Sequence, residues 1–233
     1  MHCHTLQSTG ENTAEEMVAF AKRLGIDGLG IATYYSSSVE IVPKLERVDT
    51  VSCVIIKADN ANDVDKIARK IRNKVEVLMV HGGDYDVNRA ACESSLIDVL
   101  CHPELGRKDS GMDHICMRAA AENNVAIEIN FHEILESYKR KRIYVLSAIK
   151  KNVKLAKKYG TKIVTTSGAV NKWGLRSCRD LVAFAYLLGL DLGEAIATTS
   201  TTPEEIIRVN RQKLAGKAWE GVSVAEGDEK VNV

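Results

Sequence analysis

Helix-like and strand-like patterns of hydrophobic residues alternate along most of the chain. In one set of segments apolar residues recur every three or four positions, which predicts amphipathic helices over residues 15–24, 61–72, 87–94, 112–123, 142–159 and 179–188, with a last helix after the start signal at 202–205. Between them lie short apolar runs rich in β-branched residues, which predict strands over residues 26–32, 51–56, 75–80, 97–101, 125–130 and 162–166.

This alternation predicts an α/β fold. Strands separated by helices and short loops pair in parallel through right-handed crossovers. A further short strand around His2–His4 brings the number to seven, which favours a distorted, seven-stranded TIM-like barrel over a doubly wound sheet. The chain has only three prolines and no linker rich in Pro, Gly or Ser. We therefore expect one barrel domain over residues 1–220 and a loose C-terminal tail over residues 221–233.

Charge is distributed very unevenly. The chain of 233 residues has a formal net charge of +1, yet residues 137–179 hold 13 Lys and Arg and no Asp or Glu. A dense basic sector in a nearly neutral protein indicates a surface that binds a polyanion. The alternative is a solvated, lysine-rich helix face. On the predicted helix 142–159 an apolar stripe is expected to be buried: Ile143, Leu146, Ile149, Val153 and Ala156.

Composition excludes several classes of protein. The hydrophobic content of 45% is enough for a substantial core, but no apolar run is long enough to cross a bilayer. No basic-then-apolar leader is visible at the start of the sequence. Six cysteines without a CxxC pair are typical of reduced thiols, so we expect a cytoplasmic protein. Aromatic residues make up only 5%, so platforms for stacking single-stranded bases are scarce.

Histidines stand where predicted strands end. His81 and His102 each follow a strand, and His2 and His4 form an HxH pair whose side chains point to one face of a strand. Imidazoles at the carboxyl ends of barrel strands suit a metal site. A hydrolytic metal centre also needs carboxylates that bridge its ions, and no DxH motif supplies them. The three acidic candidates are Asp84, Glu104 and Glu128. The alternative is that these histidines hydrogen-bond loops or belong to a decayed site.

An ordered series of short motifs resembles the p30-type protein family of archaeal ribonuclease P. The series consists of Val80-His81-Gly82-Gly83-Asp84, Asn88-Arg89-Ala90-Ala91-Cys92-Glu93, Ile97-Asp98-Val99-Leu100-Cys101-His102-Pro103 and Val125-Ala126-Ile127-Glu128-Ile129-Asn130-Phe131. Further on, the chain is similar to the family at Ser167-Gly168-Ala169, Leu175-Arg176-Ser177 and Asp180. The resemblance runs from the N-terminus to about residue 210.

The resemblance implies a function. Ribonuclease P removes the 5′ leader from precursor tRNA, and in the archaeal ribonucleoprotein the RNA and its Mg²⁺ ions perform the cleavage. The chain would then be a non-catalytic subunit that binds and positions RNA, with no catalytic residue and no tightly bound cofactor. Its implied partners are the RNA subunit, precursor tRNA and a small ferredoxin-like protein subunit, with two copies of each protein in a heterotetramer.

The basic sector and the motifs together define the expected RNA contacts. These are Lys139, Arg140, Lys141, Arg142, Lys150, Lys154, Lys157, Lys158, Lys172, Arg176, Arg179, Arg89 and Arg107. Phosphate contacts of this kind dominate affinity and carry little sequence information. A third hypothesis is an assembly protein without RNA contact, whose basic helix is covered by an acidic partner.

The family is related to the polymerase and histidinol phosphatase superfamily of metal-dependent phosphoesterases, which share a distorted seven-stranded barrel. By that relation His2 and His4 match the superfamily HxH, His102 matches its HP histidine and His81 matches another ligand. Other ligand positions are replaced, by Tyr34, Lys57, Gly168, Ala169 and Gly10. The resemblance thus implies vestigial histidines without a bound metal. The alternative function is a phosphoesterase of this superfamily.

Overall fold

The computed structural model describes residues 2–5, 12–37, 44–45, 48–216, 218–219 and 222–223, with side chains over 12–37, 44–45 and 48–216. The C-terminal tail expected at 221–233 therefore lies outside the described residues, apart from 222–223. Among the described residues, no helix is long and apolar enough to cross a membrane.

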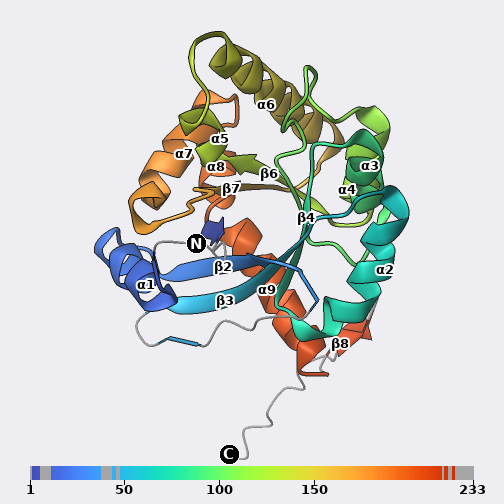
Figure 1. The fold of residues 1–233 in the computed structure, drawn as a ribbon, viewed down its shortest axis with the longest axis vertical. Coiled ribbons are helices and arrows are strands. Elements are labelled where there is room, and N and C mark those ends of the chain that lie inside the picture. The colour runs from blue at the N-terminus through green and yellow to red at the C-terminus, as the bar shows by residue number, and fades with distance from the viewer. Residues whose placement is uncertain are drawn as a thin grey trace, which may run out of the picture.

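Seven parallel strands form one curled sheet in which neighbours in sequence are neighbours in space (Figure 1). The strands are β1 (His2–Thr5), β2 (Gly28–Tyr34), β3 (Asp49–Ile56), β4 (Val77–His81), β5 (Val99–Cys101), β6 (Ala126–Asn130) and β7 (Ile163–Thr166). Each predicted strand is found, with ends shifted by a few residues. The prediction of a distorted, seven-stranded barrel-like sheet is confirmed.

The sheet curls but does not close. Parts of β1 and β7 approach within 8 Å between Cα atoms, yet their described residues form no strand pairing. The free edge of β7 is instead bonded to the chain after the sheet, because the Thr165 N–H donates to the Thr198 carbonyl at 3.1 Å. The hydroxyls of the same two threonines hydrogen-bond at 2.9 Å. This turn occupies the backbone edge that a closed barrel would pair with β1.

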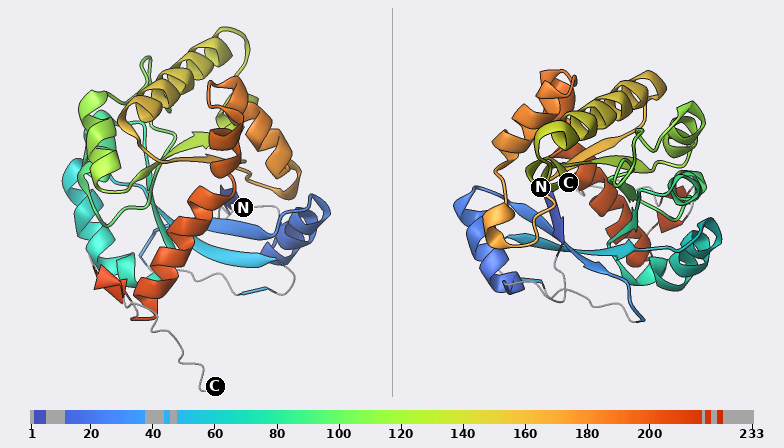
Figure 2. Two further views of the ribbon diagram at one scale, coloured as in Figure 1. Left: turned by 180° about the vertical axis from the view of Figure 1, so that it is seen from behind. Right: turned by 45° about the horizontal axis from the view of Figure 1, so that its top comes forward.

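Helices cover the outside of the curled sheet, and one helix lies against its inside (Figure 2). The helices are α1 (Ala14–Arg23), α2 (Ala61–Ile71), α3 (Tyr85–Glu93), α4 (His114–Glu122), α5 (Phe131–Leu135), α6 (Lys139–Tyr159), α7 (Cys178–Leu187), α8 (Leu192–Ala197) and α9 (Thr201–Leu214). The shorter elements are the 3₁₀ turns η1 (Arg72–Lys74) and η2 (Lys172–Gly174) and the hairpin strands β8 (Ala218–Trp219) and β9 (Val222–Ser223).

Alternating side chains of each strand build two separate cores. On β3, Val54 and Ile56 face the outer helices, whereas Cys53 and Ile55 face inward and share a cluster with Ile207 of α9. This follows from the period of two along a strand, and both sets are hydrophobic because both faces are covered. Helix α9 adds Ile207 to the inner cluster and pairs its Arg211 with Asp49 at the start of β3, so it covers the amino-terminal opening of the sheet and leaves the carboxyl ends of the strands as the place for a site.

The basic helix differs from its prediction in two ways. It begins at Lys139 rather than Arg142. Its predicted buried stripe is correct for Ile149, Val153 and Ala156 but wrong for Ile143, which is 66% exposed. The first turns of α6 extend beyond the packed core, so helical periodicity alone does not bury an apolar residue there. Helices α5 and α8 were not predicted, since five and six residues are too few to show a period.

Candidate functional site

The carboxyl ends of β2, β4 and β5 bring a tyrosine and two histidines together. The Tyr34 hydroxyl lies 3.1 Å from Nδ1 of His81, and the rings of His81 and His102 meet edge to face with centroids 4.4 Å apart. His102 is buried, has a backbone φ of +31° and has no described hydrogen-bond partner for its Nδ1. The side chains of His2 and His4 lie outside the described set, so only their place in β1 is known.

Glu128 closes the cluster from β6. Its carboxylate accepts hydrogen bonds from the Thr166 hydroxyl at 2.7 Å, the His102 backbone N–H at 3.2 Å and the Asn130 amide at 3.3 Å. Burial raises the pKa of Glu128, and the hydrogen bonds oppose that rise. The carboxylate that could have bridged metal ions thus holds the ends of β5, β6 and β7 together.

Burial also fixes the charge of the two histidines. It lowers the pKa of both His81 and His102 to about 4, and the proximity of His102 and Lys57 adds to the effect on His81. Both imidazoles are therefore neutral near pH 7. Burial raises the pKa of Tyr34 to about 12, so its hydroxyl remains protonated and can donate to His81.

The described side chains at the strand ends do not fit the metal centre that the resemblance to phosphoesterases implies. No three His, Cys, Asp or Glu side chains in the described part of the chain gather as metal ligands. The ligand atoms Nδ1 of His81 and both oxygens of Glu128 are already bonded to protein groups. Asp84, a candidate carboxylate, instead caps the start of α3 by accepting from the N–H groups of Asp86 and Val87. The absence of a bound metal stays a prediction.

Gly168, where the resemblance implies a replaced metal ligand, packs closely against Asn130. Its φ is +58°, and a Cβ at this position would stand 2.1 Å from Oδ1 of Asn130. Only glycine tolerates both this conformation and this approach. The end of β7 therefore packs directly on the Asn130 amide, and a metal-binding side chain cannot occupy residue 168 without displacing it.

The side chain of Asn88 joins three loop segments near the carboxyl ends of β4 and β5. This structural role was not predicted from the sequence. The fully buried amide of Asn88 donates to the carbonyls of Pro103 at 3.0 Å and Gly111 at 2.9 Å, and its Oδ1 accepts from Gly83 N–H at 3.1 Å. The asparagine is part of the motif at 88–93, and its position inside a helix was the one signal that could have indicated a structural amide. Asn88 fixes the loop between β5 and α4.

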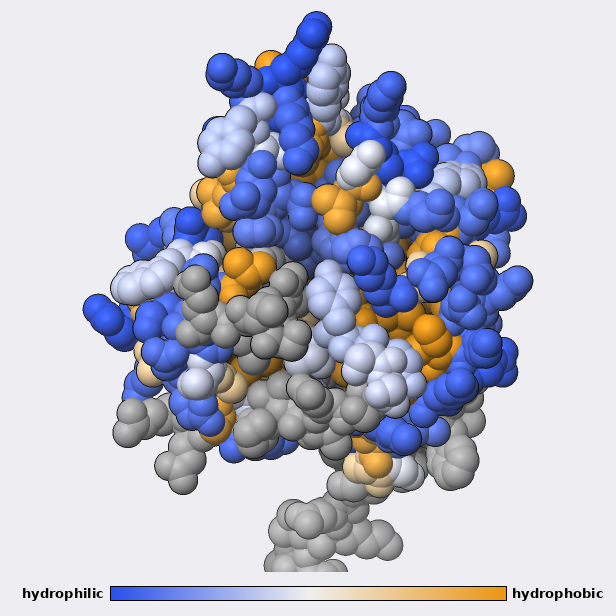
Figure 3. Space-filling model, in the orientation of Figure 1, coloured by the Kyte–Doolittle hydropathy of each residue, from blue (hydrophilic) through white to orange (hydrophobic). Residues whose placement is uncertain are grey.

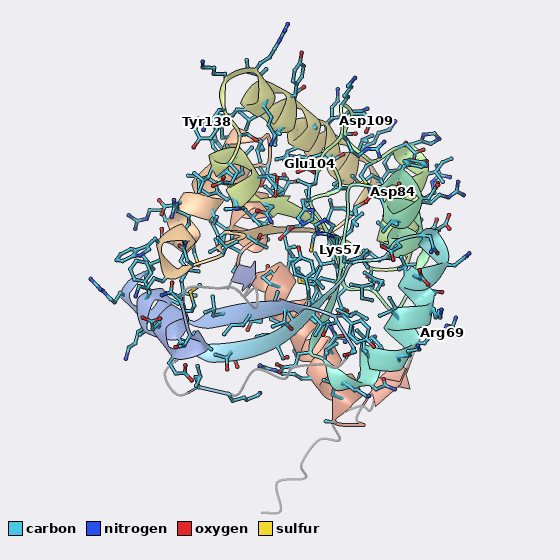
Figure 4. All side chains as sticks on the ribbon, in the orientation of Figure 1. Lys57, Arg69, Asp84, Glu104, Asp109 and Tyr138 are labelled. Carbon is cyan, nitrogen blue, oxygen red and sulfur yellow. The ribbon has the colours of Figure 1, made fainter. Side chains whose placement is uncertain are left out.

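The same loop carries a buried acid under α6. Glu104 is 5% exposed, contacts Asn152 of α6 and leaves its Oε1 without a described partner (Figure 4). The amide of Asn152 donates to the Ser110 carbonyl at 2.8 Å, which ties the loop to the helix. Burial raises the pKa of Glu104 to about 8. The group is therefore largely a neutral acid in the folded protein at pH 7.

Because the pKa of Glu104 is raised in the folded protein, we predict that the protein loses stability as the pH rises. An unfolded glutamate ionises near pH ~4.3, whereas folded Glu104 keeps its proton up to about pH 8. Between these values the folded state binds more protons, so the free energy of unfolding falls by up to about 1.4 kcal/mol per pH unit. We expect Glu104→Gln to flatten this fall, measured by urea unfolding from pH 5 to pH 8. Glu122→Gln, at an exposed site on α4, is the control. Parallel profiles for the Glu104→Gln variant and the native protein would contradict the assignment.

Helix α6 presents a cationic face to solvent. Lys150, Lys154, Lys157 and Lys158 are exposed, while Ile149, Asn152, Val153 and Ala156 are buried against the barrel. Lys139 to Arg142 are also exposed and form the first turn of the helix. In Figure 3 this projecting end, at the top of the molecule, is mostly hydrophilic, with hydrophobic side chains among the charges.

The first turn of α6 contains residues that are unfavourable at the start of a helix. Four cations occupy its first turn, where the helix dipole favours anions, and Tyr138 at the N-cap makes no capping hydrogen bond with its side chain. Lys139 has a φ of +47°. These features destabilise the helix end, and a bound anionic ligand would remove the electrostatic part of that cost.

Other expected RNA contacts have protein partners. Arg89 pairs with Glu93 at 2.8 Å, Lys172 pairs with Glu16 at 3.0 Å, and Lys157 pairs with Glu194. Exposed pairs of this type contribute little to stability, so they do not prevent these cations from contacting phosphate.

Two arginines of the expected RNA-contact set bind groups within the protein. Arg107 binds both oxygens of Asp109, at 2.6 and 3.0 Å, and donates to the Gly83 carbonyl. Arg176 donates to the backbone carbonyls of Trp173 and Leu175 and lies over the ring of Phe131. Both guanidiniums order loops next to the strand ends. Arg179, by contrast, is exposed.

Comparisons with known proteins agree with these motifs. The family model described as RNase P subunit p30 matches residues 2–215. The Ribonuclease P protein component 3 of Methanococcoides burtonii is 37% identical over 218 residues, which cover 93% of this chain and 90% of the relative. The protein of the same name from Methanosarcina mazei is 36% identical over 223 residues, 94% of this chain and 92% of the relative.

A solved structure gives the same result. A chain in the cryo-EM structure of archaeal Ribonuclease P with mature tRNA is similar to this one with a TM-score of 0.80 and 27% identity, over 98% of this chain and 100% of that chain. The family model, the relatives and this structure cover nearly the whole barrel. The chain therefore belongs to the RNase P subunit p30 family.

Proposed function

We propose that this chain is a protein subunit of ribonuclease P that binds and positions RNA while the RNA subunit cuts the 5′ leader from precursor tRNA. The observation that carries the proposal is the cationic face of α6, which lies in a stretch of 43 residues without any Asp or Glu. The membership of the family, and a relative's structure that contains tRNA, support the same role.

The chemistry of the helix suits an RNA backbone. Each Lys or Arg that meets a phosphate releases counterions, and this term supplies most of the affinity of sequence-independent binding. Paired RNA is contacted mainly through phosphates and 2′-hydroxyls, which needs cations rather than a specific pocket. The RNA-binding set proposed here consists of Lys139, Arg140, Lys141, Arg142, Lys150, Lys154, Lys158 and Arg179, with the ion-paired Lys157, Lys172 and Arg89 in support.

The strand-end cluster is proposed to be structural and not catalytic. His81 and His102 are neutral, and both oxygens of Glu128 already accept hydrogen bonds, so the described residues at the strand ends provide no open set of metal ligands. In the complex, Mg²⁺ bound by the RNA would supply the charge for the cleavage, and this chain would hold no cofactor of its own. We place this work in the cytoplasm, where buried thiols such as Cys92 stay reduced.

Reconstitution tests the proposal. Assembled from the RNA subunit and partner proteins, the enzyme is expected to process precursor tRNA much faster with this chain than without it, at matched Mg²⁺. The isolated chain is expected to hydrolyse no phosphate ester in Mn²⁺ or Zn²⁺. Phosphatase activity together with stoichiometric metal by elemental analysis, and no effect on tRNA processing, would favour the phosphoesterase alternative instead.

An exposed apolar surface on α7 and α8 indicates that the chain binds a protein partner. Tyr186 and Leu187 at the end of α7 and Leu192 and Ile196 on α8 are 59%, 66%, 60% and 48% exposed. We define these four residues as the α7–α8 patch. Contiguous exposed apolar residues mark interaction sites on otherwise soluble folds. We propose that this patch binds a small ferredoxin-like protein subunit, and that two copies of each chain form a heterotetramer.

A single charge should disrupt that assembly. We expect Leu187→Asp to weaken association with the protein partner by about tenfold or more, because a carboxylate would be buried in an apolar interface. Size-exclusion chromatography with light scattering measures the loss. Ile115→Asp, at a comparably exposed apolar position on α4, is the matched control. Equal complexes with the Leu187→Asp variant and the native protein would remove the patch from the interface.

A further inference from the structure

Two tyrosines lie beside the four cations at the start of α6. Tyr138 precedes the first turn and is 70% exposed, and Tyr144 follows it and is 57% exposed. Figure 4 places Tyr138 at the projecting start of α6, away from the barrel. Rings with this exposure contribute little to the core, and no described group forms a hydrogen bond with either phenol. Their placement therefore needs a reason other than folding.

Each ring has a cation as its neighbour. The Arg142 guanidinium lies 5.9 Å from the centre of the Tyr138 ring, four residues away. Arg140 precedes Tyr144 by four residues, so the two side chains share one face of the helix. Exposed aromatic rings combined with cations are the pattern used for single-stranded nucleic acids, where bases stack on the rings and phosphates meet the charges.

The rest of α6 lacks this pattern. Lys150 and Lys154 have no exposed ring beside them on their face of the helix. Tyr159, near the C-terminus, is half-buried, with Arg118 and Lys158 over its ring at 5.9 and 5.3 Å. The helix is thus divided into a start with open rings and a remainder with charge alone.

We propose that Tyr138 and Tyr144 are stacking platforms for unpaired nucleotides, so that the start of α6 binds a single-stranded or bulged RNA segment while the remainder binds duplex backbone. This inference rests on the proposed RNA-binding function and specifies which RNA structure the site recognises. An RNA occupant is favoured over a protein one because the four cations lie in a sector without acidic residues. That charge matches phosphate, and the rings match bases.

The test separates rings from charge. The full chain is titrated with a 12-nucleotide single strand, a fully paired 12-base-pair duplex and the same duplex with a three-nucleotide bulge. The double variant Tyr138→Leu with Tyr144→Leu removes the rings and keeps apolar bulk, and Tyr138→Phe with Tyr144→Phe keeps the rings. Circular dichroism and thermal melting check that both variants fold.

We expect the Leu pair to bind the single strand and the bulged duplex about tenfold or more weaker, as loss of base stacking predicts. Its affinity for the paired duplex and its salt dependence should be unchanged, and the Phe pair should bind all three RNAs like the native protein. Equal losses on all three RNAs, or a Phe pair as weak as the Leu pair, would overturn the proposal.

Unchanged binding of the Leu pair to every RNA would overturn it too and assign the rings to a protein contact. If the proposed function itself were wrong, charge-removing variants of α6 would also leave RNA binding unchanged. The two failures are therefore distinguishable.

Discussion

Replacing Lys139, Arg140, Lys141 and Arg142 together by glutamine is expected to produce a large loss of RNA affinity. The slope of log K against log salt concentration is negative, and each lost phosphate contact reduces its magnitude by about 0.7–0.9. Losing four contacts therefore reduces the magnitude by about 3. The four side chains are exposed, and Arg142 donates one hydrogen bond to the Ser137 carbonyl. The fold should therefore persist, and removing cations from the positive end of the helix dipole should stabilise α6. Affinity measured from 50 to 300 mM salt gives the slope.

A second quadruple variant controls for net charge. Lys66, Arg69, Lys70 and Lys74 are exposed on α2 and η1, and changing them to glutamine removes the same charge elsewhere. We expect the slope to change little in this variant. An equal decrease in both variants would mean that net charge, not the start of α6, determines binding. An unchanged slope in the α6 variant would exclude this turn from the interface.

Replacing Asn88 by alanine is expected to cause a large loss of stability. The change removes three hydrogen bonds: the buried carbonyls of Pro103 and Gly111 lose their donor, and the partly buried Gly83 N–H loses its acceptor. Unsatisfied buried groups cost about 1–3 kcal/mol each, so a loss of about 3 kcal/mol or more is expected. For a protein of this size that lowers the melting temperature by about 6–12 °C.

The neighbouring Arg89 provides the control for this experiment. Arg89→Ala lies on the exposed side of the same helix and breaks only a surface ion pair with Glu93. Its effect should stay within about 0.5 kcal/mol. Chemical unfolding followed by circular dichroism measures both variants. Equal stability of the Asn88→Ala variant and the native protein would show that water replaces the amide and that the loop does not depend on it.

The sequence was sufficient to predict the sheet because the strands β2 to β7 each have an apolar run and the long helices show a helical period, whereas β1 was expected from its HxH pair. The sequence did not predict which residues of a helix are buried, because burial depends on where the helix lies relative to the barrel. Ile143 has the spacing of a buried residue, yet the first turns of α6 project beyond the barrel and leave it exposed. The early start of α6 at Lys139 was missed because Tyr138 is not a capping residue and four cations are an unusual first turn.

The site was predictable as chemistry but not as geometry. The positions of His81, His102 and Glu128 at strand ends followed from their order in the sequence. Their bonding did not, because Tyr34 reaches His81 across 47 residues and Thr166 reaches Glu128 across 38. Likewise, the motif containing Gly168 indicated a missing ligand, and only the approach to Asn130 explains why glycine is required there.

The unclosed seam between β1 and β7 has a consequence for how the chain folds. Among the described strands, residues 2–5 pair with β2 alone, and the edge of β7 that faces away from β6 is bonded to Thr198, 33 residues further along the chain. The edge of β7 therefore gains its partner only when the segment up to residue 198, which includes α7 and α8, has folded back onto it. Contacts so distant in sequence slow folding, because a long loop must close before they form. During refolding the Thr165 amide should gain protection from hydrogen exchange later than the amides of β2 and β3, and nascent chains that end before Thr198 should carry an unprotected β7 edge.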